Sequence, residues 1–349
     1  MDGRWLDSLE ERAAAVLPPE VLEYVVQGAR EGVSAAEATA AWSSVRFRPH
    51  VLRDVTDVDI SCTLLGRKAA VPFAVSPTTL QRAVHPEGEL AMAAAVREAG
   101  SVMVVSSNAG TPFADIGATG VRWWLQLYLP QDRKHAVPLL ERAVAGGAEA
   151  VVLTVDTPVV GTKYAAGDRI IWDVVDPDFL RVNFEPGYAD AEGADKATDL
   201  AESDLAWLAE TTGLPIVVKG VLRPDDARRC VDSGVAAVWV SNHGGRQLDR
   251  TATTASSLPG VVAAVGGAAQ VYVDGGIRSG LDVLAALSLG ADAVFLGRSP
   301  LLSLVEGRPG VTRMLEELRV EVVEALRLAG CRDLADTRGL AVLDPPNGL

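Results

Sequence analysis

Residues 215–246 read PIVVKGVLRPDDARRCVDSGVAAVWVSNHGGR, and this stretch decides the fold. Two apolar runs, Pro215–Lys219 and Ala237–Ser241, flank the segment Pro224–Asp232, which has helical periodicity. The runs are hydrophobic throughout instead of alternating, which is typical of strands buried on both faces of a parallel sheet. The stretch therefore predicts a strand–helix–strand unit of an α/β protein.

The same rhythm of strand and helix recurs from about residue 71 onward. Further helices are expected over Glu89–Ala99, Ala136–Ala145 and Gly280–Leu289. Eight strand–helix units predict an α/β fold of the closed (β/α)8 TIM-barrel type. An open doubly wound sheet is the alternative, but such sheets usually have fewer strands. The six remaining strands are expected over Val71–Val75, Val102–Ser106, Trp123–Leu127, Ala150–Val155, Gln270–Val273 and Ala293–Leu296.

The chain is 349 residues long, and we expect one barrel domain over 1–349. Residues 1–47 are expected to form an N-terminal helical extension, with prolines at 18 and 19 suited to a helix start and capping-box spacing from Ser34 to Glu37. Residues 157–214 form a long polar insert after the fourth strand, rich in Asp, Gly and Pro. Such an insert is typical of a functional lid or mobile loop, although a disordered surface excursion is the alternative.

The net charge of −14 argues against nucleic acid and anionic membranes as partners. No apolar run approaches the roughly 18–20 residues that span a bilayer, and the charged N-terminus lacks an apolar signal core. The three cysteines are far apart, which favours reduced thiols. We therefore expect a cytoplasmic protein with no membrane insertion, and we predict no metal site.

Polar and glycine residues gather at the carboxyl ends of the expected strands, where barrels of this kind build their active sites. Gly275 and Gly276 allow backbone N–H groups to approach an anion, and Arg278 and Arg298 add positive charge. Because barrels commonly bind phosphate after strands seven and eight, these two clusters predict a phosphate site. Two glycine turns with solvated arginines are the alternative.

Four charged or titratable residues at other strand ends are candidates for catalytic or substrate-binding roles. His243 is a candidate base, and Asp156 could orient its imidazole. Arg246 could grip a carboxylate, although a simple pair with Asp249 is the alternative. Lys219 ends an apolar strand, and a buried ammonium would suit an anion that develops during a reaction. Together these groups are the equipment for work on an α-substituted acid.

Five motifs resemble the family of FMN-dependent α-hydroxy-acid oxidases and dehydrogenases. They are HPEGE (85–89), TVDTP (154–158), VKG (218–220), SNHGGRQLD (241–249) and DGGIR (274–278). The resemblance extends from residue 17 to residue 332. It implies a TIM barrel that binds FMN.

The resemblance also implies roles for matching positions. His243 would be the catalytic base with Asp156 behind it, and Arg246 would bind the substrate carboxylate. Tyr24 and Tyr128 would hydrogen-bond the substrate, and Lys219 would stabilise the reduced flavin. The flavin and its ribityl chain would contact Pro77, Thr78, Thr79, Ser106, Gln126, Thr154 and Ser241, and the FMN phosphate region would include Asp274, Gly275, Gly276, Arg278, Gly297 and Arg298.

Three positions depart from the family pattern. Lys163 replaces a second carboxylate-binding arginine, keeping the charge but losing the bidentate fork. Asn108 stands where the family often has an apolar or aromatic residue in the substrate pocket, and Thr79 replaces a usual alanine near the flavin. These changes predict a more polar substrate pocket; neutral drift is the alternative.

The implied reaction is oxidation of a 2-hydroxy acid to the 2-oxo acid, with reoxidation by O2 or another electron acceptor. The resemblance also implies a homo-oligomer, either a tetramer or an octamer. Three other functions stay open at this point. They are an FMN-using or phosphate-binding barrel isomerase or synthase, a non-catalytic flavin-binding protein, and a redox enzyme acting on an amine or an unusual acid.

Overall fold

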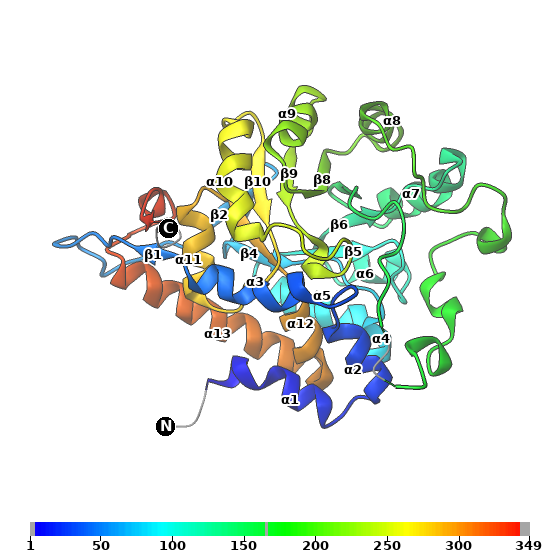
Figure 1. Ribbon diagram of the computed structural model, residues 1–349, viewed down its shortest axis with the longest axis horizontal. Coiled ribbons are helices and arrows are strands. Elements are labelled where there is room, and N and C mark those ends of the chain that lie inside the picture. The colour runs from blue at the N-terminus through cyan, green and yellow to red at the C-terminus, as the bar shows by residue number, and fades with distance from the viewer. Residues whose placement is uncertain (1–3, 165–166, 343–349) are drawn as a thin grey trace.

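The computed structural model describes residues 4–164 and 167–342 and contains a closed barrel of parallel strands (Figure 1). The barrel closes in the order β10-β11-β4-β5-β6-β7-β8-β9, which confirms the predicted fold and excludes an open sheet. Three predicted strands, those beginning at residues 102, 270 and 293, have the predicted bounds. The barrel strands are β4 (Phe73–Val75), β5 (Val102–Ser106), β6 (Arg122–Leu127), β7 (Val151–Thr154), β8 (Ile216–Val221), β9 (Ala237–Val240), β10 (Gln270–Val273) and β11 (Ala293–Leu296).

The barrel interior is filled by large aromatic side chains. Trp124, Trp239, Tyr272 and Phe295 are all buried there in mutual ring contact. The hairpin of β2 (Cys62–Leu64) and β3 (Arg67–Ala69) adds Leu64 and Ala69 to the same cluster. This hairpin, which was not predicted from the sequence, closes the amino-terminal end of the barrel, so the opposite end remains for a site.

Helices surround the barrel and pack their apolar faces on its outer surface. The longest, α13, contacts both α5 and α11 and so completes the ring across the last and first strands (Figure 1). The barrel helices are α4 (Gln81–Val84), α5 (Gly88–Glu98), α6 (Phe113–Ala118), α7 (Val137–Ala145), α8 (Glu202–Thr212), α9 (Pro224–Asp232), α10 (Thr254–Val265), α11 (Gly280–Ser288), α12 (Arg298–Ser303) and α13 (Gly307–Leu328).

The N-terminal segment is helical, as predicted, and its helices contact α12, α10 and the η6 turn (Figure 1). The predicted capping box is wrong: α3 begins at Val33, and Ser34 lies inside its first turn, buried, with its N–H donated to Asp249. The elements here are η1 (Trp5–Ser8), α1 (Leu9–Ala14), α2 (Pro19–Val26), α3 (Val33–Ser43) and β1 (Arg46–Phe47), which pairs with β12 (Ala341–Val342).

The long segment after β7 carries short 3-10 turns, and its last part is not loop but helix α8. Asn183 anchors it to the loop after β5: its amide donates to the carbonyls of Ala109 and Thr111 and accepts from the N–H of Phe113. The 3-10 turns of the chain after the first are η2 (Arg133–Ala136), η3 (Ile171–Asp173), η4 (Pro177–Leu180), η5 (Tyr188–Asp190), η6 (His243–Gly245), η7 (Leu304–Glu306) and η8 (Ala335–Thr337).

The outer limits of the predicted domain, residues 1–3 and 343–349, lie outside the described residues, as do 165–166 within the predicted insert. In the part of the chain that the structure describes, no helix combines the length and apolar character needed to cross a bilayer.

Candidate active site

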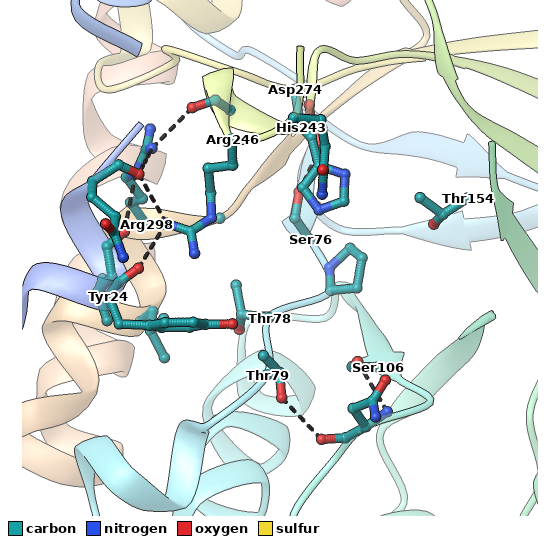
Figure 2. A pocket seen from close by; sticks show the side chains of 18 of the residues that line it. Tyr24, Ser76, Thr78, Thr79, Ser106, Thr154, His243, Arg246, Asp274 and Arg298 are labelled. Carbon is teal, nitrogen blue, oxygen red and sulfur yellow. Dashed lines mark hydrogen bonds between the residues drawn. The ribbon is translucent and has the colours of Figure 1, made fainter. Parts of the chain in front are cut away.

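A cavity of about 520 Å³ lies at the carboxyl ends of the barrel strands. Figure 2 shows Tyr24, Arg246 and Arg298 on one side of it and Ser106 and Thr154 on the other. All but two of the residues predicted for the site line this cavity: Tyr24, Pro77, Thr78, Thr79, Ser106, Asn108, Gln126, Tyr128, Thr154, Lys163, Lys219, His243, Arg246, Asp274, Gly275, Gly276, Arg278, Gly297 and Arg298.

The other two predicted residues, Asp156 and Ser241, support residues of the cavity wall. Asp156 accepts from the imidazole of His243, with 2.9 Å between Oδ1 and Nδ1. The Nδ1–H is therefore held on the carboxylate side, which leaves Nε2 as the ring atom that can accept a proton. The hydroxyl of Tyr128 lies 3.5 Å from that Nε2. His243 and Asp156 thus have the geometry of a base and its orienting carboxylate.

Burial and charge set the protonation of this pair. Burial lowers the pKa of His243, although Asp156 opposes the shift. Burial alone would raise the pKa of Asp156, but the charges of His243 and Lys219 and the hydrogen bonds that His243 and Thr157 donate to the carboxylate lower it. At neutral pH the arrangement favours a neutral imidazole beside an ionised carboxylate, which is the state that a general base requires. Burial also raises the pKa of Tyr128, so its hydroxyl stays protonated.

Glycine at position 220 permits the close approach of β8 to Asp156. Gly220 has φ +112°, and a Cβ there would lie 2.7 Å from the Cβ of Asp156. The strand bulges at this point, between Lys219 and Val221. A side chain at 220 would therefore displace the carboxylate from His243.

The His243 loop has three successive residues in the left-handed region. His243 has φ +57°, Gly244 +65° and Gly245 +75°. A Cβ on Gly245 would lie 2.4 Å from the backbone nitrogen of Ala35. The carbonyl of Gly245 accepts a hydrogen bond from the N–H of Ala29. The N-terminal segment therefore docks directly on this loop, which only glycine allows at 245.

Arg246 joins the same two parts of the chain. Its guanidinium donates to the carbonyls of Tyr24 and Gln27 and lies 4.9 Å from the centre of the Tyr24 ring. Asp249 instead accepts from backbone N–H groups of Val33, Ser34 and Arg250. The alternative pairing of Arg246 with Asp249 is therefore wrong, and within the described residues no carboxylate lies within salt-bridge distance of Arg246.

Arg278 and Arg298 converge beside the glycines that follow β10 and β11. No salt bridge to either guanidinium is present among the described residues. Burial lowers the pKa of both, and for Arg298, whose pKa falls to about 10, the charges of Arg278 and Arg246 add to the effect. A Cβ at Gly297 would meet nothing closer than 3.9 Å, so this turn leaves open space. Two crowded cations beside open space fit the phosphate of FMN.

Lys219 lies in a buried network at the centre of the site. Its Nζ donates to Ser241 Oγ at 2.8 Å and lies 3.2 Å from Asp274 Oδ2, while Ser241 donates to the other oxygen of Asp274 at 2.6 Å. The side chains of Lys219 and Asp274 are only 5% and 9% exposed. Their mutual pairing satisfies both charges in the interior.

The side chains at the three positions that depart from the family pattern each donate hydrogen bonds to backbone carbonyls. Lys163 Nζ donates to the carbonyls of Gly161 and Arg246, and the Asn108 amide donates to the carbonyl of Leu180. Thr79 donates its hydroxyl to the carbonyl of Asn108 (Figure 2). The three polar side chains predicted to make the pocket more polar therefore already form hydrogen bonds to backbone carbonyls. The bond from Asn108 also connects the long segment after β7 to the barrel.

Several residues of the cavity wall were not predicted from the sequence. Ser76 follows β4 directly, so its place at a strand end was the signal that could have found it. Other wall residues come from the long segment, which has no periodic pattern from which side-chain direction follows. These are Val160, Ile170, Ile171, Trp172, Leu180 and Lys196.

Comparisons with known proteins agree with this geometry. A family model described as FMN-dependent dehydrogenase matches residues 13–342. The chain is 40% identical to a glycolate oxidase of Spinacia oleracea, across 95% of this chain and 93% of the relative. It is also 40% identical to a 4-hydroxymandelate oxidase of Amycolatopsis orientalis, across 96% and 97%. A crystal structure of mandelate oxidase is similar with a TM-score of 0.87 and 39% identity, across 97% of this chain and 98% of that one.

Proposed function

Because this chain belongs to the FMN-dependent dehydrogenase family, we propose that it oxidises a 2-hydroxy acid to the corresponding 2-oxo acid. The observation that carries the proposal is that His243, oriented by Asp156 behind it, lines the same cavity as Arg246. A base that faces the cavity and a guanidinium without a carboxylate partner among the described residues suit removal of a proton from an acid held by its carboxylate.

FMN is the cofactor of this family, and the residues present fit it. Arg278, Arg298 and the glycines of their turns would hold the phosphate, and Lys219 would lie toward the ring system. When bound, FMN supplies a two-electron acceptor for the substrate.

The chain's own side chains divide the remaining work. Arg246 and Lys163 would bind the substrate carboxylate, and the hydroxyls of Tyr24 and Tyr128 would position it. His243 would take a proton at Nε2, and Asp156 would stabilise the imidazolium that forms.

We further propose O2 as the electron acceptor, supported by relatives that are named oxidases. Another acceptor would make the protein a dehydrogenase in the narrow sense. A homo-tetramer or octamer and a cytoplasmic location stay predictions.

An anaerobic screen of 2-hydroxy acids tests the proposed function. We expect at least one of them to bleach the flavin absorbance of the holoprotein, because two electrons pass from substrate to FMN. Admission of air should then restore the oxidised spectrum within seconds if O2 is the acceptor. Amines of similar size form the comparison set: bleaching by amines alone would replace the proposed reaction with amine oxidation.

Substrate binding is expected to depend on pH through the titration of Lys163. Burial, together with the charges of Arg246 and Lys196, lowers its pKa to about 8. The ammonium is therefore protonated below that pH and neutral above it, so kcat/KM should fall about tenfold from pH 7 to pH 9, through a rise in KM. Steady-state kinetics across this range check the effect.

Two variants make the assignment to Lys163 specific. Lys163→Arg should keep kcat/KM level through pH 9, because a guanidinium remains protonated. Lys163→Met should weaken substrate binding more than FMN binding. An unchanged alkaline fall in Lys163→Arg would assign the titration to another group, of which Lys196 is the nearest candidate.

A further inference from the structure

Lys196 is a residue of the cavity wall whose position is fixed by the backbone on both sides. The N–H of Ala197 donates to the carbonyl of Leu129 at 2.8 Å, and the N–H of Gln131 donates to the carbonyl of Asp195 at 2.7 Å. Pro130 and Lys196 form an antiparallel bridge between these two bonds. The long segment is thus clamped to the chain directly after Tyr128, so Lys196 is held beside the reacting groups.

The ammonium of Lys196 lies over the ring of Tyr128, with 3.9 Å between Nζ and the ring centre. The hydroxyl of that ring lies 3.5 Å from His243 Nε2. Among the described residues no carboxylate lies within salt-bridge distance of Lys196 and no acceptor takes a hydrogen bond from it. Burial lowers its pKa, although the charge of Asp156 opposes the shift.

This leaves a half-buried cation, lining the cavity, with only an aromatic face as its partner. A desolvated ammonium is costly to bury without an anion, so its free energy would fall if a ligand brought one. Arg246 and Lys163 already supply two cations for the carboxylate of the proposed substrate. Lys196 is therefore additional to what a simple 2-hydroxy acid requires.

We propose that Lys196 binds a second carboxylate, carried on the side chain of the substrate, and so selects 2-hydroxydicarboxylic acids. This inference rests on the proposed function and names the substrate class of the same site. Against the effect of burial, the charge of Asp156 raises the pKa of Lys196, and a carboxylate in that position repels a dianion such as phosphate more than a singly charged carboxylate.

The experiment compares two substrates of equal chain length, 2-hydroxypentanedioate and 2-hydroxypentanoate, in anaerobic flavin reduction. Lys196→Met should lower the ratio of kcat/KM for the dicarboxylate to kcat/KM for the monocarboxylate about 10- to 100-fold, the usual effect of losing a charge-assisted hydrogen bond. Lys196→Arg should keep the preference. Lys68→Met, an exposed lysine on β3 at the opposite end of the barrel, is the matched control.

A binding measurement separates this inference from the proposed function. The oxidised holoprotein is titrated with 2-oxopentanedioate and 2-oxopentanoate, and the change in flavin absorbance is followed. Tighter binding of the dicarboxylate in the native protein, lost in Lys196→Met, would support the role of Lys196. Failure of both hydroxy acids to reduce the flavin would count against the proposed oxidation and not against that role. Equal losses for both ligands, or no preference in the native protein, would overturn the role.

Discussion

Replacement of His243 by Asn is expected to slow substrate reduction of the flavin by about 10²- to 10⁴-fold while FMN stays bound. The loss follows from removal of the only atom in the proposed mechanism, Nε2, that accepts the substrate proton. Asn is the sharper substitution because His243 has φ +57°, in the left-handed region that Asn tolerates better than most residues. His243→Ala serves as a companion variant.

Anaerobic stopped-flow absorbance at the flavin band measures this rate. FMN content and the circular dichroism spectrum, compared with the native protein, show whether the site is still formed. Asp156→Asn should give a smaller loss, because the base remains but loses its orienting carboxylate. Native rates of bleaching in His243→Asn would remove His243 from the role of base.

The barrel could be predicted from the sequence because its strands are buried on both faces. Such strands are continuous apolar runs, and for Val102–Ser106 and Gln270–Val273 the predicted and observed bounds coincide. The hairpin of β2 and β3 has strands of three residues each, too short to show a period of two. Ser34 illustrates another limit: its spacing to Glu37 suggests a cap, but docking on Asp249 places it inside α3.

The site residues also fall into those that the strand pattern locates and those that only tertiary contacts locate. Residues at the end of a predicted strand or shortly after it, such as Lys219 and His243, could be placed in one cavity because parallel strands end at one edge of a barrel. The partners of Arg246 could not, since Tyr24 and Gln27 approach it only through docking of the N-terminal helices. Lys196 was missed for a similar reason: backbone bonds to 129–131, not a sequence period, set its position.

Replacement of Lys219 by Met is expected to lower the free energy of unfolding of the apoprotein by about 3–5 kcal/mol, because it leaves Asp274 as a buried charge without its cation. The same variant should reduce flavin slowly, since no ammonium would stabilise negative charge on the reduced ring. Urea unfolding of the apoprotein measures the first effect, and anaerobic stopped-flow absorbance of the FMN-loaded protein measures the second.

The double variant Lys219→Met/Asp274→Asn separates these two consequences. The amide removes the unpaired charge, and its oxygen can still accept from the hydroxyl of Ser241, so most of the lost stability should return. The rate of flavin reduction should not return, because stabilisation of the reduced ring needs the cation itself. Recovery of both would mean that Lys219 acts only by neutralising Asp274, and recovery of neither would mean that the ion pair is not what stabilises this part of the barrel.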